Sequence, residues 1–317
     1  MNHPYDSLTP DCVVDCLESI GFACDLRLLA LNSYENRVYQ VGIEEAQPIV
    51  MKFYRHGRWT DAQILEEHSF AQELVDHEIS VVAPMRVNEK TLHHAHGQRF
   101  SVFERRGGYP PELDNPDHLY RLGQTLGRIH RIGRAKPFLH RRDISSKRMA
   151  TESRIFLEEQ TVPRELMNAY STLAKDCEQT AASLLSTMTK RDMQRVHGDC
   201  HTGNILWRDD TPHFVDLDDC VSGPAIQDIW MFLSGDRFQQ ERQLSEFVSG
   251  YEEFHEFDSR QLAWIEALRT LRIMHHAFWL ASRWDDPAFP RAFPWFGQAR
   301  FWSDHILELR EQLGVMQ

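Results

Sequence analysis

The sequence lacks the features of an exported or membrane-spanning protein. None of its apolar runs approaches the ~18 residues that a membrane-spanning helix needs. Its first ten residues, Met-Asn-His-Pro-Tyr-Asp-Ser-Leu-Thr-Pro, contain no basic segment followed by an apolar core. The six cysteines include no Cys-x-x-Cys pair, and we expect them to be free thiols. Together these absences predict a cytoplasmic protein without a membrane partner.

Basic residues are also scarce. The chain has 35 Lys and Arg against 47 Asp and Glu, a net charge of -12 at pH 7. This balance opposes broad binding to nucleic acid, whereas a metal-nucleotide site tolerates it because the cation brings positive charge locally. One basic cluster, within residues 128–148, is expected to be a solvated surface or to dock an acidic substrate. With 42% hydrophobic residues in 317, the chain has room for one large domain or two lobes.

One stretch, residues 197–217, carries the polar groups that phosphoryl transfer requires. It reads His-Gly-Asp-Cys-His-Thr-Gly-Asn-Ile-Leu-Trp-Arg-Asp-Asp-Thr-Pro-His-Phe-Val-Asp-Leu. The reaction needs an acid that orients and deprotonates the attacking hydroxyl, together with oxygen ligands that hold Mg²⁺ against the phosphates. We expect Asp199 to be the catalytic base, Asn204 to bind Mg²⁺, and Asp216 to act in catalysis as a second metal ligand.

A further acid, Asp218, follows Asp216 after one residue. In an extended segment, side chains two positions apart point to the same side. Asp218 is therefore either a supplementary metal ligand or a solvated acid, and the sequence leaves both interpretations open.

Lys52 lies in the apolar segment Ile-Val-Met-Lys-Phe, where an unpaired ammonium would be costly. A helix is predicted to follow, and on it Glu67 shares a face with Ile64 and Phe70, whereas Glu66 is rotated by about 100°. We therefore expect Glu67 to point inward and hold Lys52, with Glu66 as the reserve candidate. The alternative for Lys52 is an exposed lysine on an edge strand.

The motif His-Gly-Asp-x-His-x-x-Asn followed by Val-Asp resembles the signature of the aminoglycoside phosphotransferase and choline kinase group. Four other segments resemble the bacterial stress response kinase A (RdoA-type) family: Leu-Asn-Ser-Tyr-Glu-Asn-Arg-Val-Tyr-Gln at 31–40, Lys-Phe-Tyr-Arg at 52–55, Trp-Thr-Asp-Ala-Gln-Ile-Leu-Glu-Glu-His at 59–68 and Asp-Pro-Ala-Phe-Pro at 286–290. The similarity runs nearly end to end. It implies an α+β fold of the two-lobed protein-kinase type, with a small antiparallel-sheet lobe that has one key helix and a large, mainly helical lobe.

The resemblance also implies an activity. The chain is expected to be an ATP- and Mg²⁺-dependent serine/threonine protein kinase of the bacterial stress response, which transfers the γ-phosphoryl group to a protein hydroxyl and has itself as a candidate substrate. We expect it to act as a monomer. The family match gives Lys52 the α- and β-phosphates of ATP as partners. It places the phosphate-covering turn at 32–36, where Ser33 can approach closely although no Gly-x-Gly-x-x-Gly is present.

The adenine would be read at a hinge, residues 102–105. Backbone groups near Phe103 and Glu104 would bind the edge of the purine, and neighbouring apolar side chains would cover its faces. Position alone supports this expectation. Asp228 is expected to support the site from the start of a helix.

Gly107-Gly108 followed by Pro110-Pro111 is the best composition break in the chain. We therefore predict a nucleotide-covering N-lobe at 1–106 and a C-lobe at 107–317 with the catalytic loop, the metal site and the acceptor-binding helices. In the N-lobe we expect helices at 10–20 and 60–74 and strands at 38–41, 48–54, 91–94 and 99–104. In the C-lobe we expect helices at 117–132, 164–188, 226–233, 239–254, 259–283 and 298–313.

Three alternative functions stay open. The first keeps the fold but transfers the phosphoryl group to an aminoglycoside, choline or a sugar, because the chain lacks the Ala-Pro-Glu motif and long activation segment of ordinary protein kinases. The second is a non-catalytic, nucleotide-binding pseudokinase. The third is a zinc hydrolase built on the histidines and cysteines near the signature, although their spacing matches no familiar zinc pattern; these residues are His197, Cys200, His201, His213 and Cys220.

Overall fold

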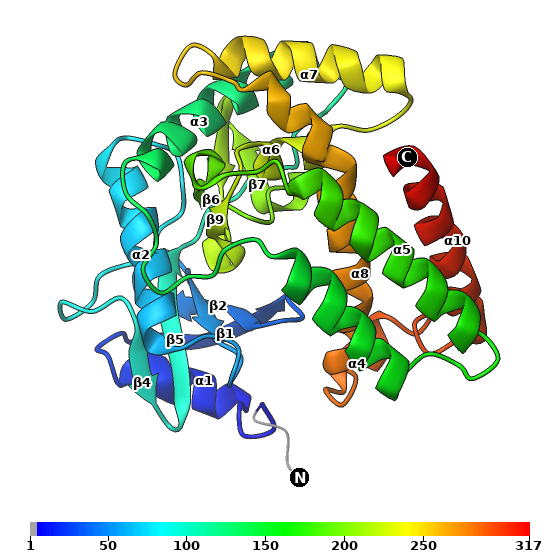
Figure 1. Ribbon diagram of the computed structural model, residues 1–317. Coiled ribbons are helices and arrows are strands. Elements are labelled where there is room, and N and C mark those ends of the chain that lie inside the picture. The colour runs from blue at the N-terminus through cyan, green and yellow to red at the C-terminus, as the bar shows by residue number, and fades with distance from the viewer. Residues whose placement is uncertain (1–4) are drawn as a thin grey trace. The chain divides into compact units, whose positions relative to one another are not determined.

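The computed structural model describes residues 5–317, and an antiparallel five-stranded sheet forms the centre of the N-terminal part (Figure 1). The strand order is β1-β2-β3-β5-β4. The strands are β1 (Cys24–Leu31), β2 (Arg37–Ile43), β3 (Ile49–Phe53), β4 (His93–Ala95) and β5 (Gln98–Glu104). The strands expected near 38–41, 48–54, 91–94 and 99–104 are confirmed. Strand β1 was not expected, because its leucine-rich sequence has little β preference by itself and pairing with β2 holds it extended.

Helix α1 (Pro10–Glu18) packs on one face of this sheet (Figure 1). The Thr9 side chain accepts a hydrogen bond from the Cys12 amide and caps the helix, as its Thr-Pro start predicts. Val13 and Leu17 are fully buried against apolar residues from the alternate positions of the central strands. Helix α1 therefore covers this face of the sheet.

Helix α2 (Asp61–Asp76) follows β3 and begins with a capping box, in which Thr60 and Gln63 each satisfy a backbone amide of the other. Ile64, Phe70 and Leu74 are buried, so the predicted apolar face is confirmed. The helix continues two residues beyond the predicted end at Leu74.

Two further helices pack very closely against each other, α3 (Pro116–Arg134) and α7 (Arg237–Tyr251). A Cβ placed on Gly123 would lie 2.0 Å from the carbonyl oxygen of Phe247, so glycine is required at this contact. The short strands β6 (Gln194–Val196) and β9 (Val221–Gly223) pair with each other, and β7 (Ile205–Arg208) forms a hairpin with β8 (Thr211–Phe214). Residues 197–204 of the predicted catalytic stretch, with Asp199 and Asn204, lie between β6 and β7, and Asp216 follows β8.

The described chain forms two compact units. The first contains the described residues up to Arg142 together with Gln194–Ser222 and Met231–Phe257, and the second contains Asp143–Met193, Gly223–Trp230 and Asp258–Gln317. The central sheet and the signature segment therefore belong to the same unit. This grouping is distinct from the division into lobes at 106/107, which stays a prediction.

The second unit is helical. Its helix α5 packs on α8 and α10, and α4 packs on α8. The helices are α4 (Ser153–Gln160), α5 (Met167–Leu185), α6 (Ile226–Ile229), α8 (Ile265–Ser282), α9 (Ala288–Ala292) and α10 (Ala299–Met316). The helix expected at 226–233 is one α-helical turn continued by a 3-10 turn, and α4 was not expected. Within residues 5–317, no helix is both long and apolar enough to cross a bilayer.

Candidate active site

The His-Gly-Asp motif lies directly after β6, where the chain turns sharply. Gly198 has a φ of +86°, and a Cβ at this position would lie 2.2 Å from the carbonyl oxygen of Asp219. Only glycine fits this backbone conformation and this close approach. His197 is buried and its Nε2 lies 2.9 Å from the carbonyl oxygen of Val215. These contacts hold the segment that contains Asp199 against the segment that contains Asp216.

Asn204 lies at the end of a short 3-10 turn and is oriented by the loop that carries Asp199. Its Nδ2 donates a hydrogen bond to the carbonyl oxygen of Asp199 at 2.9 Å. Its own carbonyl oxygen accepts from the amide of Val215 at 3.0 Å, one residue before Asp216. With the amide nitrogen used in this way, Asn204 retains its Oδ1 as a potential metal ligand, which fits the oxygen preference of Mg²⁺.

Asp216 adopts a left-handed backbone conformation with φ 57° and ψ 64°. Its side chain is 51% exposed, and Oδ1 lies 2.7 Å from Nζ of Lys52, whose side chain is 7% exposed. Burial alone would lower the pKa of Lys52, but the carboxylates of Asp216 and Asp218 outweigh it and raise this pKa well above its ordinary value. The alternative of an exposed edge-strand lysine is therefore wrong, because β3 lies inside the sheet.

The structure corrects the expectation for Asp218. The segment after Asp216 is a 3-10 turn, not an extended strand, so alternation does not apply. Asp218 is 2% exposed, accepts a hydrogen bond from Nδ2 of Asn36 at 3.0 Å, and forms ion pairs with Arg58 and Lys52. Burial raises its pKa, but these cations more than compensate and hold it below its ordinary value. The interpretation as a solvated acid is wrong because buried cations surround the carboxylate.

Glu67 points inward as predicted, with 3% of its surface exposed. It does not form the expected ion pair, because Lys52 pairs instead with Asp216 and Asp218. Burial raises the pKa of the Glu67 carboxyl to about 7, against the opposing effect of Lys52. The Glu66 carboxylate binds the backbone of residues 139–141, so Glu66 is not the reserve partner of Lys52 either.

The carboxylate of Glu66 accepts hydrogen bonds from three successive backbone amides, those of residues 139–141, at 2.5, 2.8 and 2.6 Å. The side chain of Arg141 then donates from Nε to the carbonyl oxygen of Cys220 at 2.9 Å, and from Nη2 to that of Asp218. Its guanidinium also lies 4.0 Å from the ring of Trp59. Helix α2 is thus connected to the turn after Asp216.

Sequence reasoning missed these connections. Arg141 belongs to the basic cluster that was expected to be a solvated surface or to dock an acidic substrate, but its side chain is buried, with 5% of the residue exposed. Asn36 and Arg58 were not singled out, although both contact Asp218. Asn36 lies in a segment that carries the family resemblance, and this was the available signal. For Arg58 and Arg141 the sequence contains no local signal, because their partners are distant in the chain.

The face of the sheet opposite α1 carries Lys52 and an apolar surface. Strand register pairs Leu31 with Val38, Val38 with Lys52, and Val50 with Phe103. Side chains alternate along each strand, so these four apolar residues lie on the same face as Lys52. Val38, Val50 and Phe103 are partly buried, and Leu31 is exposed. This face therefore offers an apolar platform beside an ammonium group.

The remaining predicted nucleotide-binding residues, Ser33, Phe103 and Glu104, lie on this platform or next to it in the sequence. The Ser33 hydroxyl donates to the carbonyl oxygen of Asn36 at 3.2 Å and closes the turn before β2. Phe103 is on the platform, whereas Glu104 is exposed at the end of β5 and pairs in register with Ile49 on the other face. A contribution of Glu104 to the predicted hinge would therefore come from its backbone.

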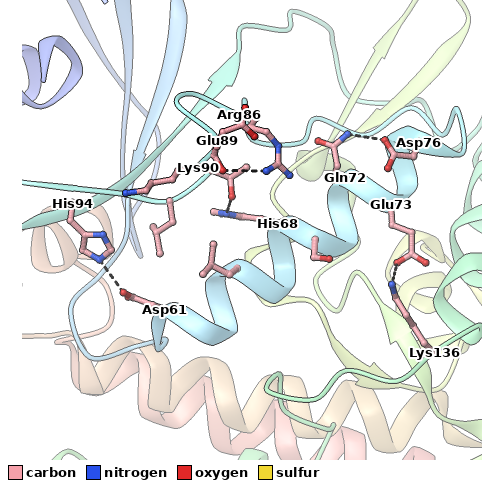
Figure 2. Close-up of a pocket in the computed structure, with 14 residues that line it drawn as sticks. Asp61, His68, Gln72, Glu73, Asp76, Arg86, Glu89, Lys90, His94 and Lys136 are labelled. Carbon is pink, nitrogen blue, oxygen red and sulfur yellow. Dashed lines mark hydrogen bonds and ion pairs between the residues drawn. The ribbon is translucent and has the colours of Figure 1, made fainter. Parts of the chain in front are cut away.

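A separate cavity of about 780 Å³ is lined by α2 and by residues 86–94, and none of the predicted site residues lines it. Figure 2 shows His68 pointing from α2 toward the segment that carries Glu89 and Lys90. His68 Nδ1 lies 2.9 Å from the Thr91 hydroxyl, and Nε2 lies 2.8 Å from the Tyr54 hydroxyl. Burial lowers the pKa of His68 to about 3, so it is a neutral structural residue.

The zinc alternative finds no support in the geometry. Across residues 5–317, no group of three or more His, Cys, Asp or Glu side chains is arranged to hold a metal ion. Cys200 and Cys220 are fully buried, and burial raises the pKa of the Cys220 thiol, which disfavours a thiolate ligand.

Comparison with known proteins identifies the family. Residues 27–268 match the phosphotransferase enzyme family. The chain is 44% identical to stress response kinase A of Shigella flexneri, over 99% of this chain and 95% of the relative. It is 42% identical to the serine/threonine protein kinase RdoA of Salmonella typhimurium, over 98% and 94%.

Solved structures agree on the fold. Amicoumacin kinase hAmiN in complex with AMP-PNP, Ca²⁺ and Ami has a TM-score of 0.75 and 22% identity, with 96% of this chain and 92% of that chain covered. A microcompartment-associated aminopropanol kinase has a TM-score of 0.72 and 15% identity, with 96% of both chains covered. The expected α+β, kinase-like fold is confirmed. On its match to the family and its identity to these relatives, the chain belongs to the phosphotransferase enzyme family, and within it to the stress response kinase A proteins.

Proposed function

We propose that this phosphotransferase is an ATP- and Mg²⁺-dependent serine/threonine protein kinase. One observation carries the proposal: Lys52 from the sheet, Asp199 and Asn204 from the catalytic segment, and Asp216 from the following turn are connected within one compact unit. Lys52 Nζ lies 2.7 Å from Asp216 Oδ1, and Asn204 Nδ2 lies 2.9 Å from the carbonyl oxygen of Asp199. A pseudokinase would be expected to lack one of these groups.

The apolar platform supports ATP as the phosphoryl donor. Val38, Val50 and Phe103 form a partly exposed surface on the same face as Lys52. A purine ring is flat and apolar on its faces, whereas its triphosphate is anionic, so a platform next to an ammonium matches both parts of the molecule. The turn closed by Ser33 would cover the phosphates, and backbone groups near Phe103 and Glu104 would read the purine edge.

Mg²⁺ fits the oxygen donors of the site. Asp216 offers a carboxylate that is half exposed, and Asn204 offers its amide oxygen. Both are ligand types that Mg²⁺ prefers, and the ion would neutralise phosphate charge when bound. Lys52 is held between Asp216 and Asp218, so its ammonium is positioned to contact anionic phosphate oxygens while Glu67 supports it electrostatically from α2.

Asp199 would aim the acceptor hydroxyl and accept its proton late in the transfer. The loop geometry holds this residue through its backbone, since its carbonyl oxygen binds Asn204 and Gly198 permits the sharp turn. Catalysis would consist mainly of positioning and charge neutralisation, because the transferred group needs little covalent assistance.

The protein acceptor is proposed from the relatives. Stress response kinase A and the serine/threonine protein kinase RdoA share 44% and 42% identity with the chain nearly end to end. The name of the first relative supports a role in the bacterial stress response. From the sequence we further propose that the protein is a cytoplasmic monomer that also phosphorylates itself.

The test is phosphate transfer from radiolabelled ATP with Mg²⁺, offered to casein-like proteins, to aminoglycosides and to choline. Label is expected on serine or threonine of the protein acceptors and of the chain itself, and Asp199→Asn should remove it. Label found only on a small molecule would replace the protein acceptor with the alternative substrate class. Nucleotide binding without any transfer would support the pseudokinase alternative instead.

A further inference from the structure

Arg58 connects the two segments that the proposed function assigns to the phosphates and to the metal. Its guanidinium contacts the carboxylates of Asp218 and Asp219, immediately after Asp216. Its Nε also lies 3.7 Å from Oε1 of Glu35, in the turn that precedes β2. The Arg58 side chain is 13% exposed, and the Asp218 and Glu35 side chains are buried to a similar degree, whereas that of Asp219 is 46% exposed.

A second contact joins the same two segments. Asn36 is 3% exposed and donates from Nδ2 to Asp218 Oδ2 at 3.0 Å. Its Oδ1 accepts from the backbone amide of Arg55 at 3.2 Å, so the segment that carries Arg58 also fixes the turn at 33–36. Arg55 adds an ion pair with Glu35 at 3.1 Å.

The chemistry of arginine suits this bridge. A guanidinium presents several donors in a rigid plane and can bind two carboxylates at once, whereas a lysine ammonium is a single flexible point charge. Asp218 and Asp219 are adjacent acids that would repel each other without a shared cation. Arg58 therefore fixes the turn Leu217–Asp219 and, with it, the backbone position of Asp216.

We propose that Arg58 is a positioning residue that holds the phosphate-covering turn at 33–36 and the metal-binding turn at 216–219 in fixed positions relative to each other. It acts through Asp218, Asp219 and Glu35, and it does not itself contact the reacting atoms. As a consequence, loss of the Arg58 contacts should reduce the order of both turns and not of one alone. This inference rests on the proposed function only for the roles of the two turns, since the bridge itself is a property of the fold.

The first test does not require activity. Amide hydrogen exchange is measured for the wild type, Arg58→Gln and Arg58→Lys, with Arg27→Gln as the matched control. Arg27 is a sheet arginine whose side chain is 74% exposed and pairs with Asp25, within the same strand. Exchange at both 33–36 and 216–219 is expected to rise in Arg58→Gln, to rise less in Arg58→Lys, and to stay at the wild-type rate in the control. Faster exchange in only one of the two turns would overturn the proposal.

The second test uses the Mg²⁺ concentration that gives half-maximal phosphotransfer. Loss of a residue that orients a metal ligand costs about tenfold or more in metal affinity, so this concentration is expected to rise about tenfold in Arg58→Gln. The half-maximal Mg²⁺ concentration of the conservative variant Arg58→Lys should lie between those of Arg58→Gln and the wild type. Because Arg58→Lys keeps the positive charge, it is expected to fold even if Arg58→Gln does not. An unchanged Mg²⁺ requirement with normal kcat would refute the positioning role. A wild type without phosphotransfer would contradict the proposed function, while the exchange measurement would still decide whether Arg58 joins the turns.

Discussion

Lys52 and Asp216 are 164 positions apart in the sequence, yet Nζ of the lysine lies 2.7 Å from Oδ1 of the aspartate. The lysine is buried, and the aspartate is half exposed. Lys52 has a second carboxylate at 3.3 Å, from Asp218. A buried cation between two acids therefore joins the sheet to the turn after β8.

Asp216→Ala is expected to weaken Mg²⁺-dependent nucleotide binding by about tenfold or more, because it removes a proposed metal ligand and one partner of Lys52. Calorimetric titration with ATP, in the presence of Mg²⁺ and then of a chelator, measures the metal-dependent part. Asp209→Ala is the control, since the Asp209 side chain is 87% exposed on the β7–β8 turn. If Mg²⁺ enhanced ATP binding equally in both variants, Asp216 would not be a ligand.

Asp199→Asn is expected to lower kcat by about 10² to 10⁴, the usual contribution of a general base, and to leave ATP binding nearly unchanged. The amide preserves the shape of the side chain and removes its ability to accept the proton. Steady-state kinetics and a parallel ATP titration separate the two effects. Turnover at the wild-type rate would remove Asp199 from the role of base.

Glu66→Gln is expected to lower the free energy of unfolding by about 1 to 3 kcal/mol, because its carboxylate accepts three charge-assisted hydrogen bonds from the amides of residues 139–141. Urea unfolding measures the change. Glu18→Gln, at an exposed position of α1, provides the control and should lie close to the wild type. Equal stability of both variants would show that the link between α2 and residues 139–141 contributes little.

Glu67 should make stability depend on pH. Burial raises the pKa of its carboxyl to about 7 in the folded chain, above the ordinary value of about 4.3 in an unfolded chain. The folded state therefore binds this proton more tightly, and the stabilisation is fully present below the unfolded pKa and lost as pH rises through about 7. Glu67→Gln, which cannot titrate, is expected to gain stability relative to the wild type between about pH 5 and about pH 8. Urea unfolding of both proteins at these two pH values measures the change. If the difference in stability between Glu67→Gln and the wild type did not depend on pH, the raised pKa of Glu67 would be contradicted.

Local signals predicted much of the fold. The Thr9-Pro10 start fixed the beginning of α1, and the apolar spacing of Ile64, Phe70 and Leu74 identified the buried face of α2. These predictions succeed because capping and helical periodicity depend on residues a few positions apart. Strand β1 was missed because an edge strand with exposed leucines becomes extended only by pairing with β2.

In the candidate site, too, the sequence predicted the local features and missed contacts between distant segments. The residue types of Asp199, Asn204 and Asp216, with their spacing, indicated phosphoryl transfer, and the family match supports that class of reaction. The partner of Lys52 was predicted incorrectly, because helix periodicity shows which way Glu67 points but not how far the acids of another segment approach. For Asp218 the sequence left two interpretations open, and the one as a solvated acid is wrong because the residue is buried. The alternation behind both interpretations does not apply, since the left-handed conformation of Asp216 and the 3-10 turn after it interrupt the extended chain.

The sequence by itself determined the reaction class, the beginning and buried face of the key helix, and the set of polar groups available for chemistry. Only the tertiary structure decided which of these groups meet: Lys52 with Asp216 and Asp218, Arg58 with Asp218 and Asp219, and Glu66 with the backbone of residues 139–141. The physical reason is that capping and periodicity act over a few residues. Ion pairs between segments more than 150 positions apart depend instead on how the packed sheet, helix and loops bring charges together and shield them from water.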